Sequence, residues 1–221
     1  MKKITALTQG KRRDKRVNVF LDGKFTFSLN ASVATTEALK VGHELTARQE
    51  EALVKSDQFQ RCFDAAMRYL GYRPHSEAEL SGKLRQRNFD DGNITEVIAR
   101  LKVLGLVDDA AFTKFWKDKR QTFSPRSQWL TKSELRRKGV ATEIIDDAAD
   151  TIDDNDSAYR AAMTRVGRLP LSDYQAFRRR LGDFLRRRGF SYGVINQTIA
   201  RIWQEHGGST DKLLLKIISS E

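Results

Sequence analysis

The chain has 221 residues, of which 39% are hydrophobic and 31% charged, with a formal net charge of +11 and a pI of about 9.9. This length allows one or two domains with real cores, and the lack of any apolar run of about 18 residues excludes a transmembrane helix. The positive balance favours an anionic partner, either nucleic acid or an acidic protein surface.

The residues that usually carry chemistry are few. The start of the chain has two lysines but no apolar signal core behind them, so we expect a cytoplasmic protein with no membrane partner. Cys62 lies on an apolar helical stripe and is expected in the core. His43, His75 and His206 are far apart and lack metal-ligand spacing, so we expect surface or capping roles for them. Because no Gly-rich phosphate loop occurs either, the sequence predicts no cofactor and no enzyme.

The first 30 residues have the pattern of a β-hairpin. Apolar residues alternate on both sides of Asp22-Gly23, the strongest short signal for a hairpin turn. A strict two-residue loop would place the two apolar sets on opposite faces. A longer connection or a bulge would pair Leu21 with Phe25 and Val19 with Phe27, and would bury both sets together.

The flanks of this hairpin predict further short elements. Residues 4–7 can add a third strand, and residues 31–57 have the pattern of short helices on either side of residues 41–45, with Gly42 and His43 in a turn. Thr46 and Gln49 stand at the positions of a helix cap and its capping-box partner.

From about residue 58 the apolar spacing becomes that of helices. Cap residues then mark where the predicted helices begin, and residues that tolerate a left-handed backbone mark where they end. The predicted starts are Ser76, Asp108-Asp109, Ser127 and Thr142, and the predicted stops are Asn88, Gly139 and Gly189.

Three stretches share a leucine, a cluster of Arg and Lys, a small residue and then an apolar residue. They are residues 83–89, 134–140 and 184–190, and their leucines are 51 and 50 residues apart. Such self-similarity at a fixed period is typical of repeat architectures. Each stretch ends the middle helix of a predicted three-helix unit, so each unit would present one cationic helix end.

The sequence therefore predicts a mainly α fold of three tandem three-helix repeats behind a small β-hairpin or meander. The predicted regions are a β-rich N-terminal region with short helices (1–57), repeats 1 to 3 (58–106, 107–153 and 154–206) and a C-terminal tail (207–221), in which residues 213–218 can form a short helix.

Charge is segregated along the chain. Residues 1–16 hold seven Lys and Arg against one Asp, and residues 157–205 hold ten Arg against three acids. Residues 141–156 hold seven acids and no base. The candidate residues for binding a filament or DNA are the cations of the N-terminal segment and of the repeated stretches: Arg12, Arg13, Lys15, Arg16, Arg85, Arg87, Arg136, Arg137, Lys138, Arg178, Arg179, Arg186, Arg187 and Arg188.

Two interpretations of these cations stay open. They can simply complement the helix macrodipole and keep the surface soluble, or they can bind phosphate or carboxylate, for which the planar fork of Arg is suited. No unit places Asn or Gln for base reading, so contacts to DNA should be to phosphates. Trp116, Trp129 and Trp203 are expected in cores rather than as stacking platforms.

Several of these motifs resemble those of the RecX family, bacterial modulators of the RecA recombinase. The combination of Arg73-x-x-Ser76-Glu77-x-Glu79-Leu80 with Leu106-Val107-Asp108-Asp109, followed by the stretch 134–140, carries the resemblance. It is strong over residues 60–150 and weaker over the last repeat, and the run 16–23 resembles an extra segment that some members have. Asn88 stands where a glycine is usual, and residues 124–127 lack a glycine often found there.

The resemblance implies an elongated, curved array of repeats that binds in the groove of the filament formed by RecA on single-stranded DNA. It also implies inhibition of the filament's ATPase, strand-exchange and coprotease activities, in recombinational DNA repair and the SOS response. The alternative is a DNA-binding protein of helix-turn-helix-like repeats that acts on single-stranded or duplex DNA without RecA. We expect a monomer in either case.

Overall fold

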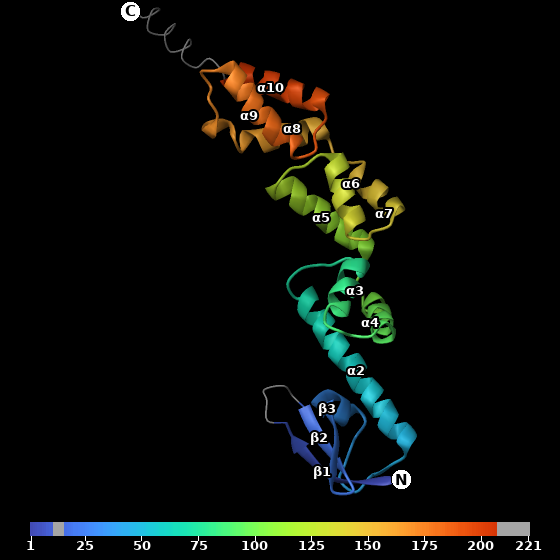
Figure 1. Ribbon diagram of the computed structural model, residues 1–221. Helices are drawn as coiled ribbons and strands as arrows, with labels where there is room; N and C mark the ends of the chain where they lie inside the picture. Colours follow the sequence, from blue (N-terminus) through green and yellow to red (C-terminus); the bar gives the residue numbers. More distant parts are fainter. Residues whose placement is uncertain (11–15, 207–221) are drawn as a thin grey trace, which may run out of the picture. The chain divides into compact units, whose positions relative to one another are not determined.

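The computed structural model describes residues 1–10 and 16–206 (Figure 1). The chain is mainly helical with a small antiparallel sheet at its start, which confirms the predicted fold class. Its contacts divide it into two compact units, of which one spans Met1–Val107 and the other begins at Asp108. The residues expected to form a C-terminal helix, 213–218, lie outside the described residues.

The first unit opens with a four-stranded antiparallel sheet in the order β3-β2-β1-β4. Its strands are β1 (Lys2–Gln9), β2 (Arg16–Leu21), β3 (Lys24–Asn30) and β4 (Glu44–Leu45), and a short helix, α1 (Ala31–Thr36), follows β3. Alternate strand residues such as Ile4, Val19 and Leu29 are buried against Val33 of α1 and Leu53 of the next helix. The third strand predicted at residues 4–7 is therefore present as β1.

The hairpin turn is the tight one. Leu21 pairs with Lys24, so the loop consists of two residues. Both loop residues have positive φ, 49° at Asp22 and 81° at Gly23, as the turn types that match the strand twist require.

A bulge then restores the burial that this tight turn would lose. The register shifts next to Val19, which pairs with Phe27 as predicted. The predicted pairing of Leu21 with Phe25 is wrong, because Phe25 lies before the bulge and pairs with Phe20. Phe25 is consequently 58% exposed and packs edge-on against the Phe20 ring, with 5.8 Å between the centroids.

Helices are present on both sides of residues 41–45, as predicted: α1 ends at Thr36 and the next helix begins at Ala47. Gly42, between them, has a φ of 94°, which ends any helix there, and β4 follows it. The edge of β1 supplies the partners: the backbone N–H of Gly42 donates to the carbonyl of Ile4, and the Ile4 N–H donates to the carbonyl of His43. A strand of two residues has too little pattern to be read from sequence.

Helix α2 (Ala47–Leu70) joins the sheet to the helices that follow. It begins with the complete capping box of Thr46 and Gln49, as predicted. Its 24 residues run without a break through residue 57, where the sequence suggests a boundary. Asp57 is buried in its middle and accepts hydrogen bonds from the Arg16 guanidinium and the Asn30 backbone N–H, so α2 is tied to the sheet.

Nine helices among the described residues form three groups of three, here called repeats 1, 2 and 3, each with its own buried cluster. Repeat 1 consists of α2, α3 (Glu77–Arg85) and α4 (Asp91–Val103); repeat 2 of α5 (Asp109–Phe123), α6 (Gln128–Arg137) and α7 (Thr142–Ala149); repeat 3 of α8 (Asp154–Met163), α9 (Tyr174–Arg186) and α10 (Tyr192–His206), with a 3₁₀ turn at Val166–Arg168.

Most of the predicted caps are confirmed. The side chains of Ser76, Asp108 and Ser127 each accept a hydrogen bond from a backbone N–H in the first turn of the helix that follows. Thr142 is the exception, since it is the first helical residue of α7 and the cap position belongs to Ala141, with no side-chain cap bond in this described helix.

The three repeated stretches are three copies of one backbone structure. Each middle helix ends in a residue with positive φ, whose N–H and the next N–H both bond back to the last turn, which is a Schellman motif. The left-handed residues are Asn88 (60°), Gly139 (74°) and Gly189 (84°), and the N–H groups of Phe89, Val140 and Phe190 donate to the carbonyls of Leu84, Leu135 and Leu185. All three predicted stops are confirmed.

Candidate binding surfaces

The Schellman motif divides the cations of each repeated stretch into two kinds. The last cation before the left-handed residue packs on an aromatic ring of its own repeat: Arg87 on Tyr69 at 5.4 Å, Lys138 on Trp116 at 4.2 Å and Arg188 on Phe184 at 4.5 Å from the ring centroid. Such cation–π contacts stabilise the fold. These three predicted binding residues therefore already have a structural role.

Of these three residues, Arg188 also makes contacts within the fold beyond its own repeat. Its Nη1 donates to Ser124 Oγ at 2.8 Å and to the Pro125 carbonyl at 3.0 Å, while its own carbonyl accepts the Ser127 N–H at 3.0 Å. Burial also lowers the pKa of Arg188. It therefore joins repeat 3 to repeat 2 and is not on an open surface.

The earlier arginines of the stretches are exposed. Arg85 forms an ion pair with Asp91 at 2.7 Å, and Arg186 forms one with Asp183 at 3.1 Å. Arg136, Arg137 and Arg187 are exposed at the ends of α6 and α9. Surface ion pairs of this kind contribute little to stability, so these side chains can exchange partners at small cost.

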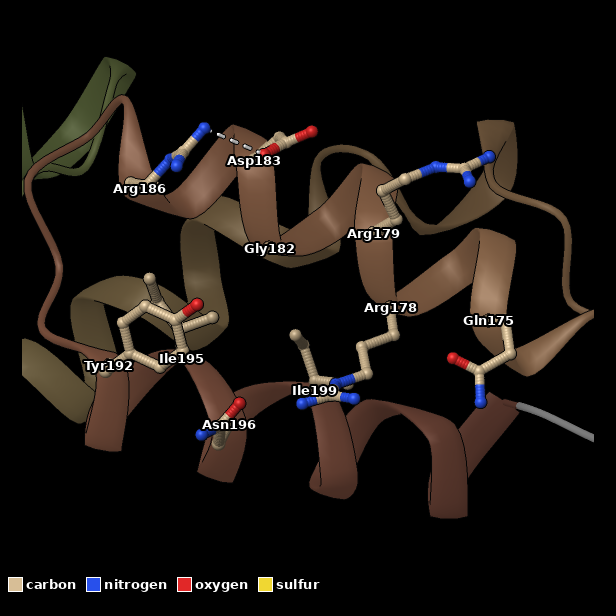
Figure 2. A pocket seen from close by; sticks show the side chains of 10 residues that line it. All are labelled: Gln175, Arg178, Arg179, Gly182, Asp183, Arg186, Tyr192, Ile195, Asn196 and Ile199. Atoms are coloured by element: carbon tan, nitrogen blue, oxygen red, sulfur yellow. Dashed lines mark hydrogen bonds and ion pairs between the residues drawn. The ribbon is translucent and has the colours of Figure 1, made fainter.

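Arg178, Arg179 and Arg186 lie together. They line one wall of a groove of about 270 Å³ between α9 and α10, here called the α9–α10 groove. Figure 2 shows Arg178 reaching from α9 toward the α10 wall, and Arg186 beside Asp183. Leu181 and Leu185 are buried on the opposite face of α9, as predicted, so the arginines are left facing solvent.

The other wall and the floor of the α9–α10 groove carry no formal charge. Tyr192 and Asn196 stand on the α10 wall, and Ile195 and Ile199 form the apolar floor together with Gly182 of α9. A Cβ at Gly182 would meet the Ile199 and Ile195 side chains at 3.7 and 3.9 Å. Asn196 was not predicted to lie with the arginines, because it is on a different helix.

A second cationic groove lies in the first unit, here called the α2 groove. It has about 1090 Å³ and is lined by Arg16 and Arg87, two predicted residues, together with Arg61 and Arg68 of α2. Arg61 and Arg68 were not among the predicted residues, although they are seven residues, or two helical turns, apart and therefore lie on one face of α2. Their charges are partly balanced by Asp64, which accepts hydrogen bonds from Asn30 and Gln60 on the same groove.

A buried carboxylate binds two other arginines of repeat 2, which are therefore not available to a ligand. Glu134 is 6% exposed and accepts hydrogen bonds from Trp116 Nε1 at 2.9 Å, Arg120 Nε at 2.8 Å and the guanidinium of Arg126. Burial lowers the pKa of both Arg120 and Arg126. Glu134 is the first residue of the stretch 134–140, yet its contacts are inside repeat 2.

Two further predictions concern single residues. Cys62 is buried as expected, and burial raises the pKa of its thiol to about 11. The surface or capping role expected for His75 is wrong: it is 4% exposed, with Nδ1 2.9 Å from the Arg73 carbonyl and its ring beside Tyr69. The ion pair between Arg73 and Glu79 closes this loop and holds His75 inside.

The three tryptophans differ in burial. Trp116 and Trp203 are half-buried against the clusters of repeats 2 and 3, as expected. The core position expected for Trp129 is wrong, because it is 66% exposed. It lies in the first turn of α6, and the buried face of this helix is formed by Thr131, Glu134 and Leu135.

Arg12, Arg13 and Lys15 lie outside the described residues. Within residues 1–10 and 16–206, no group of three or more His, Cys, Asp or Glu side chains is arranged to hold a metal ion. No helix in the same part of the chain is long and apolar enough to cross a membrane.

Comparisons with known proteins find relatives of this chain. Family models match at residues 2–46 (regulatory protein RecX N-terminal domain), 62–101 (RecX, first three-helix domain) and 153–199 (RecX, third three-helix domain). The regulatory protein RecX of Clostridium beijerinckii is 30% identical over 208 residues, which cover 91% of this chain and 96% of that protein. That of Bacillus subtilis is 28% identical over 218 residues, covering 97% and 82%.

Solved structures agree on the fold. A crystal structure of regulatory protein RecX matches with a TM-score of 0.65 at 24% identity, covering 90% of this chain and 98% of that one. RecX from Lactobacillus salivarius matches with a TM-score of 0.55 at 24% identity, covering 66% and 97%. The 30% identity over nearly the whole length and the three family-model matches show that the chain belongs to the RecX family of regulatory proteins.

Proposed function

We propose that this chain binds the filament of RecA on single-stranded DNA and lowers its ATPase, strand-exchange and coprotease activities. It would act as a monomer in the cytoplasm, in recombinational DNA repair and the SOS response. The observation that carries the proposal is the RecX family membership of a chain with cationic grooves on two different repeats.

The two grooves suit a long repetitive partner. Arginine dominates both, and its planar fork binds carboxylate or phosphate in a bidentate way. Each groove alone offers only surface contacts, which are weak in water. When one partner engages both, the second contact forms at a high effective concentration, so modest contacts add up to useful affinity.

Co-sedimentation with a RecA–single-stranded DNA filament, together with the ATPase rate of the filament, tests this. We expect the chain to pellet with the filament and to lower the ATPase rate at stoichiometric amounts. Charge reversal at Arg178, Arg179 and Arg186 should weaken both effects at least tenfold, because each contact becomes repulsive.

The matched control reverses three exposed cations outside both grooves, Arg48, Arg100 and Lys114. This variant has the same net charge as the groove variant and should behave as wild type. Absence of co-sedimentation and of any ATPase effect would reject the proposal. Equal loss in both variants would show that net charge alone acts.

A second candidate function is DNA binding without RecA. Gln175 and Asn196, which line the α9–α10 groove with the arginines, favour it, because side-chain amides hydrogen-bond base edges. It predicts a steep salt dependence on bare duplex DNA together with sequence preference. Binding that is weak and blind to sequence would count against it.

A further inference from the structure

The two walls of the α9–α10 groove differ in chemistry. The α9 wall carries Arg178, Arg179 and Arg186, whereas the α10 wall carries the ring of Tyr192 and the amide of Asn196 above an apolar floor. Tyr192 is 76% exposed, so its ring is open to a ligand at the mouth of the groove. A purely phosphate-binding surface needs only the first wall.

We propose that the α9–α10 groove holds one unstacked base of a single nucleic-acid strand, with the strand's phosphates along α9. The base would stack on the Tyr192 ring, which lies beside Ile195 at one end of the groove, while the guanidinium of Arg178, beside Ile199 toward the other end, would bind a phosphate (Figure 2). Proteins bind the bases of single strands by stacking them on aromatic rings and on Arg planes. The Asn196 amide then hydrogen-bonds the edge of the base.

The dimensions favour a strand over a free nucleotide. Arg178 and Arg186 are eight residues apart, which is about 12 Å along a helix. Neighbouring phosphates follow each other at about 3.4 Å along the axis in one strand of a duplex, so the cations span several nucleotides. The groove, at about 270 Å³, is below the usual range for small-ligand pockets and suits one flat ring system.

Asp183 limits the affinity of this groove. Its carboxylate pairs with Arg186 at 3.1 Å and lines the same groove, so it competes with a phosphate for that cation and repels the strand. Removing its charge should therefore strengthen binding. A gain of this kind cannot come from misfolding, which makes Asp183 the most informative position.

The proposal deepens the proposed function, because it names the ligand of one groove, but its test needs no RecA. Fluorescence anisotropy of the full chain with a labelled single-stranded oligonucleotide is the assay, with the duplex of the same sequence and free ATP as competitors. We expect the single strand to bind at least tenfold tighter than the duplex, and ATP at the same nucleotide concentration not to displace it.

The variants separate stacking from charge. Tyr192→Ala should weaken binding about tenfold, which is 1.4 kcal/mol, while Tyr192→Phe keeps the ring and should bind as wild type. Gly182→Met fills the floor and should weaken binding without changing the salt slope, whereas Gly182→Ala fits in ordinary contact and should not. Asp183→Asn should bind more tightly and add about 0.7 to the salt slope for one further phosphate.

Equal affinity for single strand and duplex would overturn the proposal, as would unchanged binding in both Tyr192→Ala and Gly182→Met. Displacement by ATP would reassign the groove to a free nucleotide and equally reject the strand. If the oligonucleotide results are as expected and the filament assay fails, only the proposed function is rejected. If filament binding holds in Tyr192→Ala and its oligonucleotide affinity is also unchanged, only the base site is rejected.

Discussion

Gly189 is the position where the repeat motif and the contact between repeats 2 and 3 meet, and replacing it by alanine tests both. Its φ of 84° costs an L-residue about 1–2 kcal/mol. A Cβ there would also lie 2.6 Å from Ser127 Oγ and 2.7 Å from Leu130 Cβ of α6. Overpacking of this kind typically costs about 1–3 kcal/mol. We therefore expect Gly189→Ala to lower the free energy of unfolding of the second unit by about 2–5 kcal/mol.

Gly105 provides the matched control. It also ends a helix with a left-handed backbone, φ 67°, but a Cβ there would meet nothing within 4 Å. Gly105→Ala should thus cost only the backbone strain, about 1–2 kcal/mol, and the difference between the two variants isolates the contact with α6.

Urea titration measures both costs. All three tryptophans, Trp116, Trp129 and Trp203, lie in the second unit, so their fluorescence follows Gly189→Ala, while far-UV circular dichroism follows Gly105→Ala. Equal costs for the two variants would refute the close contact between Gly189 and α6.

Three further predictions use the same titrations. Glu134→Gln should destabilise the second unit by about 2–3 kcal/mol, because it leaves two partly buried arginines without their carboxylate; a cost below about 1 kcal/mol would contradict this. Arg188→Ala should cost about 1–3 kcal/mol, while Arg187→Ala should leave stability unchanged, and similar results for both would contradict the structural role of Arg188. Burial lowers the pKa of His75 in the folded chain, so the unfolded chain takes up the proton at a higher pH. The stability that neutral His75 contributes to the first unit should therefore be fully present above pH 6.5 and be lost as the pH falls through the lowered folded-state pKa. This pH dependence should disappear in His75→Gln.

The sequence predicted what short-range chemistry decides. The caps Thr46, Ser76 and Ser127 were readable because the side chain and the N–H it accepts from are three residues apart. Helix stops such as Gly189 were readable because few residues tolerate positive φ. The hairpin shows the boundary of this reasoning: Asp22-Gly23 set the turn, but the bulge that restores the register depends on what the sheet must bury.

What the sequence could not predict depends on neighbours that are distant in the chain. Arg186, Arg187 and Arg188 are the same residue type, yet of the three only Arg188 donates a hydrogen bond to the carbonyl of Pro125, 63 residues away. Arg16 and Arg87 share the α2 groove only because α2 is continuous. No local pattern contains either fact.

The three copies of the repeated stretch therefore share one backbone structure, but their side chains have different roles. A Schellman motif must end each middle helix, and a cation just before it is favoured by the helix dipole and by a ring of the same repeat. These needs account for Arg87, Lys138 and Arg188 without any ligand. They do not account for Arg178 and Arg179, which lie about two turns before the end of α9 and face a groove with an exposed tyrosine. Function should therefore be sought where the cations exceed what the repeat requires, and that excess is greatest in repeat 3.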